Sequence, residues 1–250
     1  MGALRPLAAM AFCLALAPTA LAQDANDNLN AVLWMQKSVE YKANAEAVFA
    51  LAKIRLDEAL KDKSWTAAPA EQTGDFANLT PAVVADADET VLDNSTYQKE
   101  RAEQGLAFTA DSWDAWVRRV AADDLPGAAA FIARARRLGG RVVIVSNRDA
   151  HICDPTRENL RRLEIVVDAV LCREQGVSDK NPRFHAVAAG ALPGLPALEV
   201  LLWIGDNIQD FPGLSQDIPT ADPAAFAQFG QRYFILPNPM YGSWERNPPR

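Results

Sequence analysis

The sequence predicts an α/β fold with one parallel sheet, a helical extension before it and a small helical insert after its first strand. Short apolar runs alternate with helical patterns along the chain, which is typical of a parallel sheet with right-handed crossovers. Several of these runs end in charged or hydroxyl side chains. The 250 residues, 49% of them hydrophobic, are enough for one sizeable core.

The first 22 residues have the pattern of a secretory signal peptide. Arg5 provides the positive start, residues 7–17 form the apolar middle, and Ala20-Leu21-Ala22 is a small-x-small cleavage site. We therefore expect cleavage before Gln23, a mature domain over residues 23–250, and a periplasmic or secreted protein. The apolar run is too short to cross a bilayer comfortably, and no later run is long enough, so no transmembrane segment is expected.

Net charge and cysteine content limit the partners and the redox chemistry. The formal charge of −7 argues against a nucleic-acid polymer or an anionic membrane as partner. An anionic small substrate would need local cations or a metal. Cys153 and Cys172 remain after the signal peptide leaves, so they form either a disulfide in an oxidising compartment or two buried thiols.

The N-terminal part of the domain is predicted to be helical. Apolar side chains recur at three- and four-residue steps over residues 28–61 without Gly or Pro, which indicates one long helix or two with a bend near Asn44. A polar connection leads to the first strand, residues 82–85. Residues 94–126 then form the mostly helical insert.

The remaining pattern alternates between helices and strands. We expect helices over 128–138, 155–163 and 182–190, and strands over 141–145, 166–171, 198–204 and 233–236. In open parallel sheets, ligands bind beyond the carboxyl ends of the strands. The side chains that follow each strand are therefore expected to meet at one edge.

Two carboxylates one residue apart, Asp86 and Asp88, follow the first strand. Two such acids repel each other, and a Mg²⁺ ion bound by carboxylate oxygens is the simplest remedy. A calcium loop starting at Asp86 fails, because its sixth position is Val91 and its twelfth is Tyr97. A plain acidic turn is about as compatible with this motif alone.

The other strand ends supply a hydroxyl, cations and more carboxylates. They are Ser146 and Arg148, then Lys180 and Arg183, then Asp206 and Asp210. A carboxylate can attack a phosphoryl group, a second acid can protonate the leaving oxygen, and cations and hydroxyls can hold the remaining oxygens. On residue type alone, Lys180 and Arg183 fit solvated surface charges equally well, and Arg148 fits a structural partner of a nearby acid.

The segment Asp86-Ala87-Asp88-Glu89-Thr90 resembles motif one of the haloacid dehalogenase superfamily. Ser146, Lys180 and the segment from Gly205 to Asp210 resemble its motifs two, three and four, in order. The chain is more closely similar to the class C nonspecific acid phosphatases of the bacterial lipoprotein e family. The stretches that carry this resemblance are 33–42, 86–97, 146–148, 205–211 and 237–245.

The resemblance implies a Rossmann-like core with a cap and a role for each motif residue. Asp86 would be the nucleophile and a Mg²⁺ ligand. Asp88 would be the acid/base, with its backbone carbonyl on the metal. Ser146 would bind phosphate, and Lys180 would bridge phosphate and nucleophile.

The resemblance also implies the metal and substrate contacts. Asp206 would be a metal ligand, and Asp210 a ligand or a support for one. The substrate-binding candidates are Asn147, Arg148, Trp113 and Tyr241, although plain packing explains the two aromatic residues as well.

The implied function is that of a secreted Mg²⁺-dependent acid phosphatase acting on nucleoside monophosphates and aryl phosphates through an aspartyl-phosphate. Its partner would be a small phosphomonoester, and a homodimer is left open. Lipoprotein e is anchored through a cysteine, but here Cys13 lies inside the apolar segment, so no lipid anchor is expected. The alternatives are a non-catalytic binding or storage protein on the same fold and a phosphotransferase with an alcohol acceptor.

Overall fold

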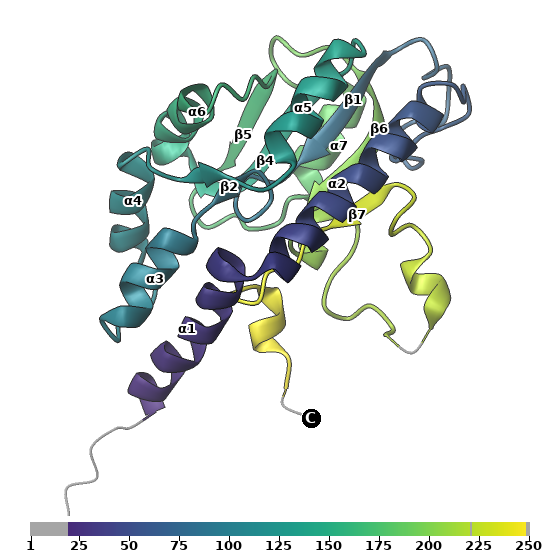
Figure 1. Ribbon diagram of the computed structural model, residues 1–250. Helices are drawn as coiled ribbons and strands as arrows, with labels where there is room; N and C mark the ends of the chain where they lie inside the picture. The colour runs from purple at the N-terminus through teal and green to yellow at the C-terminus, as the bar shows by residue number, and fades with distance from the viewer. Residues whose placement is uncertain (1–19, 221, 249–250) are drawn as a thin grey trace, which may run out of the picture.

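The computed structural model of the protein describes residues 20–220 and 222–248, with side chains from residue 28 onward. Most of the predicted signal peptide lies outside these residues. A five-stranded parallel sheet in the order β5-β4-β1-β6-β7 forms the centre of the molecule (Figure 1). Its strands are β1 (Thr80–Ala85), β4 (Arg141–Asp149), β5 (Ala169–Arg173), β6 (Leu198–Gly205) and β7 (Tyr233–Ile235).

Helices cover both faces of this sheet. Val83 and Ala85 of β1 face a hydrophobic cluster that includes side chains of α2 (Val39–Ala59), α5 (Ala128–Arg137) and α6 (Cys153–Arg162). Ala82 and Val84 face a second cluster with α7 (Asn181–Ala189). This alternation is the two-residue period of a strand buried on both sides. The predicted α/β fold is therefore confirmed.

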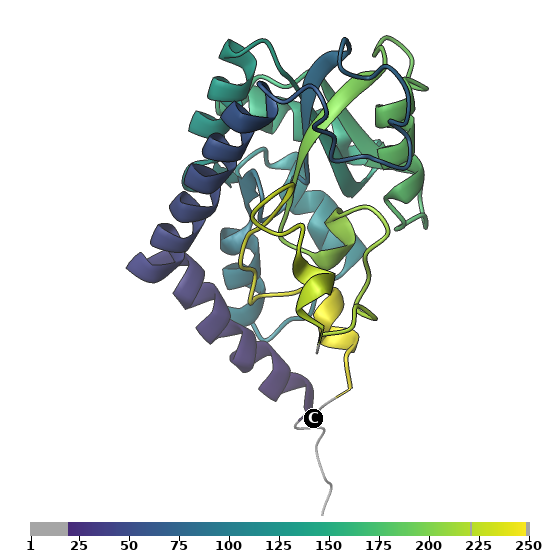
Figure 2. The same ribbon diagram turned by 90° about the vertical axis from the view of Figure 1, so that its right-hand side faces the viewer.

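The N-terminal extension consists of two helices that meet at an angle, α1 (Ala20–Lys37) and α2 (Figure 2). The helical conformation is interrupted at Ser38, so the bend predicted near Asn44 is wrong. Ser38 is extended, with ψ of 138°, and its hydroxyl accepts a hydrogen bond from the backbone N–H of Tyr41 at 3.0 Å. A serine in this role starts a new helix.

The insert after β1 is built from two short helices between two short strands. The order is β2 (Leu92–Asp93), α3 (Ser95–Glu103), α4 (Ala110–Arg118) and β3 (Asp123–Asp124). The strands β2 and β3 pair antiparallel, a two-stranded ribbon too short to show a sequence period. Helix α1 lies against α3, where the Gln36 amide donates to the Ser95 hydroxyl at 3.1 Å.

The largest differences from the predicted strand boundaries are in β4 and β5. Strand β4 continues to Asp149, beyond the predicted end at residue 145, and β5 begins at Ala169 instead of residue 166. Val166 is exposed, and the Asp168 carboxylate accepts bonds from Arg136, Arg141 and the N–H of Val142. Val166 and Val167 precede the ladder, although their apolar character suggests a strand, and the first backbone bond to β4 comes from the N–H of Asp168 to the Val142 carbonyl at 2.8 Å.

A disulfide joins Cys153, the first residue of α6, to Cys172 in the edge strand β5, with a Cα–Cα distance of 5.9 Å. Of the two alternatives that the sequence leaves open, the structure therefore contains the disulfide. The bridge fastens the outermost strand of the sheet to the helix that follows β4.

The disulfide is expected to stabilise the fold measurably. Closing a loop between residues 19 apart is worth about 3 kcal/mol through the reduced entropy of the unfolded chain. The double variant Cys153→Ser/Cys172→Ser should therefore unfold at a lower denaturant concentration than the oxidised protein. Reduction of the wild-type protein should give a similar loss, and reduction of the double variant should give none. Equal midpoints for the oxidised wild type and the double variant would contradict the expectation.

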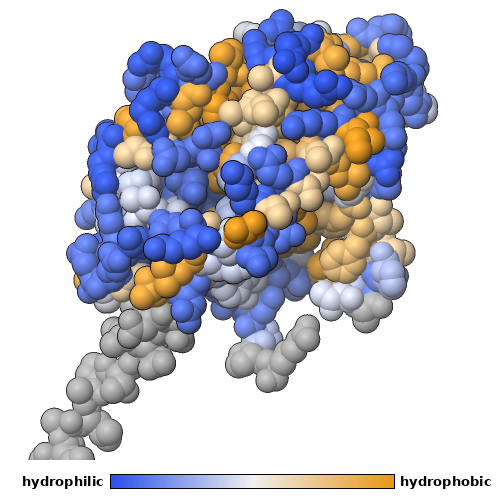
Figure 3. Space-filling view, in the orientation of Figure 1, coloured by the Kyte–Doolittle hydropathy of each residue, from blue (hydrophilic) through white to orange (hydrophobic). Residues whose placement is uncertain are grey.

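On the face shown in Figure 3, hydrophobic residues form separate patches among hydrophilic ones. Phe108, at the tip of the insert, is one of the more exposed large apolar side chains in the described part of the protein. Among the described helices, none combines the length and apolar character needed to span a membrane.

Candidate functional site

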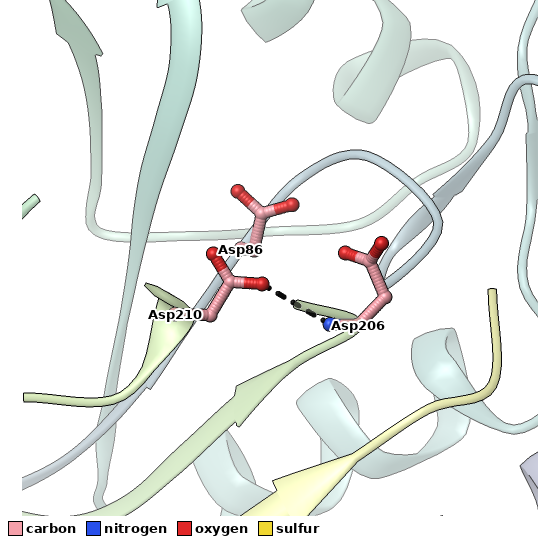
Figure 4. Close-up of side chains that lie close together, drawn as sticks. All are labelled: Asp86, Asp206 and Asp210. Carbon is pink, nitrogen blue, oxygen red and sulfur yellow. Dashed lines mark hydrogen bonds between the residues drawn. The ribbon is translucent and has the colours of Figure 1, made fainter. Parts of the chain in front are cut away.

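Three acidic side chains meet at the carboxyl edge of the sheet (Figure 4). Asp86 follows β1, and its backbone N–H donates to the carbonyl of Ile204 in β6 at 2.9 Å. Asp206 follows β6, and Asp210 ends the short 3₁₀ helix η2 (Ile208–Asp210). One carboxylate oxygen from each residue lies within 4.8 Å of the others. The parallel topology thus brings Asp86 next to two acids that lie more than a hundred positions later in the sequence.

Lys180 supplies the positive charge at this cluster. It is the N-cap residue of α7, and its buried ammonium group donates to Asp86 and, at 2.6 Å, to Asp210. Of the two roles open for Lys180, the solvated surface charge is therefore wrong. One cation opposes three carboxyl groups, so the cluster has surplus negative charge when all three are ionised. An all-oxygen donor set with surplus negative charge fits a hard divalent cation.

The loop after β6 is shaped by close backbone contacts. The second oxygen of Asp210 accepts from the N–H groups of Asp206 at 3.2 Å and Asn207 at 2.9 Å. A Cβ on Gly205 would lie 2.2 Å from the Asp210 side chain, so only glycine fits at this position. Asp206 is oriented from two other loops, by the Thr90 hydroxyl at 3.2 Å and the Asn238 amide at 2.9 Å.

Burial and mutual repulsion shift the proton affinities of the acids. Burial raises the pKa of Asp86 to about 7, while Lys180 opposes this shift and Asp210 and Asp88 add to it. Burial, followed by Asp210 and Asp86, also raises the pKa of Asp206 well above its usual range. For Lys180, burial alone would lower the pKa, but the two carboxylates raise it above its ordinary value.

The raised carboxyl pKa values predict that the metal-free protein is more stable in mild acid than at neutral pH. Between pH 3.8 and about pH 7, the folded state holds a proton on Asp86 that the unfolded chain has released. Stability therefore falls as the pH rises through this window, by at least about 1 kcal/mol. Denaturant unfolding of the chelated protein at several pH values checks the sign. Stability that rises from about pH 5 to about pH 8 would contradict it.

Asp88 lies in the same loop but has different partners. Its carboxylate pairs with Arg148, whose Nε and Nη2 donate at 3.0 Å and 2.7 Å. Its backbone N–H donates to Asp86 Oδ2 at 2.9 Å. Arg148, for which the sequence leaves substrate binding or pairing with an acid open, thus makes the ion pair here.

The other predicted residues lie around this centre. Ser146, buried on β4, accepts a hydrogen bond from the N–H of Arg148 at 3.1 Å. Asn147 accepts a bond from Arg183, and Arg183 also donates to the Ser146 carbonyl, so Arg183 is a structural support of β4 instead of a free surface charge. These bonds fix the backbone of the second motif.

The two aromatic candidates are partly exposed and pack against neighbours. Trp113 lies edge-on to Tyr97 at 5.2 Å between ring centroids, and the guanidinium of Arg148 lies 5.3 Å from the centroid of the Trp113 ring. Tyr241 packs against the main hydrophobic cluster. A ligand-binding role for either residue stays a prediction.

Sequence reasoning missed four polar residues that hold the acids in place, namely Glu89, Thr90, Asn94 and Asn238. Glu89 and Asn94 are fully buried and are hydrogen-bonded to each other. Burial, followed by repulsion from Asp88 and Asp206, raises the pKa of Glu89 well above its usual range. Glu89 also has a φ of 50°, a left-handed conformation that is unusual for a residue other than glycine. All four lie inside the stretches that carry the resemblance, and this position is the sequence feature that could have pointed to them.

A model of the HAD superfamily, subfamily IIIB (Acid phosphatase), matches residues 9–244 of the chain. The chain belongs to this family. This HAD acid phosphatase is similar to the solved class C acid phosphatase from Bacillus anthracis, with 31% identity, a TM-score of 0.75, and coverage of 89% of this chain and 88% of that one. The Bacillus anthracis enzyme with tungstate bound gives 30% identity, a TM-score of 0.73, and coverage of 88% and 87%.

The family assignment confirms the predicted resemblance and makes the HAD acid phosphatase a phosphomonoesterase. HAD phosphatases use a divalent metal, and the cluster of Asp86, Asp206 and Asp210 has the donor chemistry to bind one. A small phosphomonoester is the substrate class that such an enzyme binds.

Proposed function

We propose that this protein is an exported Mg²⁺-dependent acid phosphatase that hydrolyses nucleoside monophosphates and aryl phosphates through an aspartyl-phosphate. One observation carries the proposal. A buried lysine and three carboxylates meet at the carboxyl edge of the sheet, with a negative charge in excess. This arrangement supports both a nucleophilic carboxylate and a site for a hard cation.

In the proposed reaction, a carboxylate oxygen of Asp86 attacks phosphorus, and the bond from phosphorus to the alcohol oxygen breaks. Asp88 gives its proton to the departing oxygen. Water then attacks the phosphorus of the phospho-aspartate, Asp88 takes a proton from this water, and the bond to Asp86 breaks to release inorganic phosphate. Lys180 and Ser146 hold the phosphoryl oxygens during both steps.

Asp86, Asp206, Asp210 and the backbone carbonyl of Asp88 are the groups that would hold Mg²⁺. When bound, the cation neutralises the charge of the carboxylate and the phosphate, so that the two can approach. Trp113 and Tyr241 are both partly exposed, which supports a role in contacting the ring of a nucleoside or an aryl ester.

Phosphate release from an aryl phosphate tests the metal dependence. Exhaustive chelation is expected to lower the rate by at least about 10²-fold, and adding Mg²⁺ should restore it. A covalent aspartyl-phosphate should be trapped by rapid acid quenching and should decompose with hydroxylamine. Full activity after chelation would refute the Mg²⁺ dependence, and a substrate panel would rank nucleotides against sugar and aryl phosphates.

Export through residues 1–22 is part of the same proposal. Expression of the whole chain in a bacterial host should yield a mature protein that begins at Gln23 in the periplasm or the medium. A chain that lacks residues 1–22 should stay in the cytoplasm. Recovery of the full-length chain from the cytoplasm would argue against export.

A further inference from the structure

Asn94 connects the acid loop to the insert. It lies between β2 and α3, is completely buried, and uses both ends of its carboxamide. Its Nδ2 donates to Asp88 Oδ1 at 2.9 Å, and its Oδ1 accepts from the indole N–H of Trp116 in α4 at 2.8 Å. The carboxylate of Asp88 can only accept, so it must face the amide nitrogen of Asn94, and the indole N–H can only donate, so it must face the amide oxygen. These partners therefore fix the orientation of the amide.

Arg148 completes this arrangement. Its Nη2 donates to both Asp88 Oδ1 and Asn94 Oδ1, at 2.7 Å and 3.2 Å, and its Nη1 donates to the Thr156 hydroxyl in α6 at 3.1 Å. The side chain is almost fully buried, and its guanidinium lies over the ring of Trp113 in α4. Asp88, Asn94 and Arg148 thus form a closed triangle, with α4 on its outer side.

The two oxygens of Asp88 differ because of this triangle. Oδ1 accepts from Asn94 Nδ2, Arg148 Nε and Arg148 Nη2. Within the described part of the chain, Oδ2 accepts only a longer bond of 3.2 Å from Arg148 Nε. An oxygen with three donors has no lone pair left for a proton. Oδ2 is therefore the oxygen that is available to exchange a proton with a leaving group.

Asn94 also holds the turn that carries Asp88. Its backbone N–H donates to Glu89 Oε1 at 2.7 Å, and the Glu89 N–H donates to the Leu92 carbonyl at 2.8 Å. One residue therefore fixes both the carboxylate of Asp88 and the backbone immediately after it. The only insert helix bonded to this residue's side chain among the described contacts is α4, through Trp116.

We propose that Asn94 is a positioning residue that couples the insert to proton transfer. Through Trp116 and Arg148 it holds Asp88 with Oδ2 turned toward the leaving oxygen, so that displacement of α4 misplaces the general acid. The inference rests on the proposed function, in which Asp88 protonates the leaving group. It adds a role for Asn94 and for the Trp116 indole that neither the motifs nor the ligand set contains.

The test uses two leaving groups in the Mg²⁺-supplied enzyme. From a nucleoside 5′-monophosphate the leaving group is the nucleoside alkoxide, a poor leaving group that needs a proton, whereas 4-nitrophenolate departs from 4-nitrophenyl phosphate with little help. General-acid catalysis is worth about 10²–10⁴-fold where it is needed. Asn94→Ala is therefore expected to lower kcat/KM for the nucleotide by about 10²-fold and for the aryl ester by less than about tenfold. The value of kcat/KM depends only on the steps up to release of the alcohol. The later attack of water on the phospho-aspartate therefore does not affect it.

Trp116→Phe provides the second variant, because it keeps an aromatic ring in the core and removes the indole N–H donor. It is expected to shift the ratio of the two substrates in the same direction, by about three- to tenfold. Tyr97→Phe is the matched control. It removes a hydroxyl of the insert that bonds Ser112 at 2.9 Å and that makes no hydrogen bond to Asn94. Its substrate ratio should equal that of the wild type.

Each outcome has a distinct meaning. A selective loss for the nucleotide in both variants supports the coupling. An equal loss of kcat/KM for both substrates means that Asn94 only supports the fold. An unchanged ratio of the two kcat/KM values in Trp116→Phe means that α4 is not linked to proton transfer. Either result overturns the proposal. If Asn94→Ala does not fold, the ratio in Trp116→Phe decides. Failure of the proposed function is recognised separately, because the wild-type enzyme would then release no phosphate.

Discussion

Asp86→Asn is expected to abolish phosphomonoester hydrolysis while the protein stays folded. An amide oxygen is a poor nucleophile, so the loss should be at least about 10⁴-fold in kcat. The fold should tolerate the change, because asparagine has the same shape and Lys180 keeps its bond to Asp210 at 2.6 Å. Removing one of three crowded carboxylates should leave the thermal unfolding temperature of the metal-free protein equal or higher.

Initial rates with an aryl phosphate, together with thermal unfolding, check this result. Asp75→Asn is the control and should retain full activity, because Asp75 is an exposed carboxylate in the segment that enters β1 at the end opposite the site. If Asp86→Asn keeps near-normal turnover, another group must attack phosphorus. If it loses both activity and fold, the variant reports stability alone, and the trapped phospho-aspartate then decides the nucleophile.

Lys180→Met is expected to damage stability as well as activity. The substitution leaves the buried carboxylates of Asp86 and Asp210 without their counter-charge. Breaking a buried ion pair in this way costs about 3–5 kcal/mol. Turnover should also fall by at least about 10²-fold, because the phosphoryl oxygens lose a cation.

Denaturant unfolding of the metal-free protein measures the effect. Lys99→Met serves as the control, since Lys99 forms an exposed pair with Glu103 at 3.7 Å and its loss should change stability by less than about 0.5 kcal/mol. Mg²⁺ should restore part of the stability of Lys180→Met, because it brings positive charge to the same carboxylates. A variant as stable as the wild type without metal would show that the ion pair is not needed for folding.

The order of elements was accessible from the sequence because burial on both faces leaves a strong apolar signal. Strand β6 is buried along its whole length, and α2 buries residues at three- and four-residue steps. The break at Ser38 was missed because a serine cap inside a helical pattern changes little in hydrophobicity. Asn44 suggested a bend, but it lies on the exposed side of α2, where a polar residue is tolerated.

The grouping of the acids followed from topology alone. If Asp86, Lys180, Asp206 and Asp210 all follow parallel strands, they must meet at one edge. The contacts that orient them did not follow, because they join distant loops. Asn238 reaches Asp206 from 32 positions away, and Arg148 reaches Asp88 from 60. Hydrogen bonds of this kind depend on side-chain directions that no periodic pattern encodes.

The ammonium group of Lys180 makes folding independent of metal binding, two events that are linked in many small metalloproteins. Where a metal alone holds a domain together, the metal-free chain is unfolded and a chelator denatures the protein. Here a permanent internal counter-ion, the Lys180 ammonium, already pairs with two of the three acids, Asp86 and Asp210. The polypeptide can therefore complete its folding first and acquire the metal afterwards from its surroundings, and repeated cycles of stripping and reloading should return the same native protein.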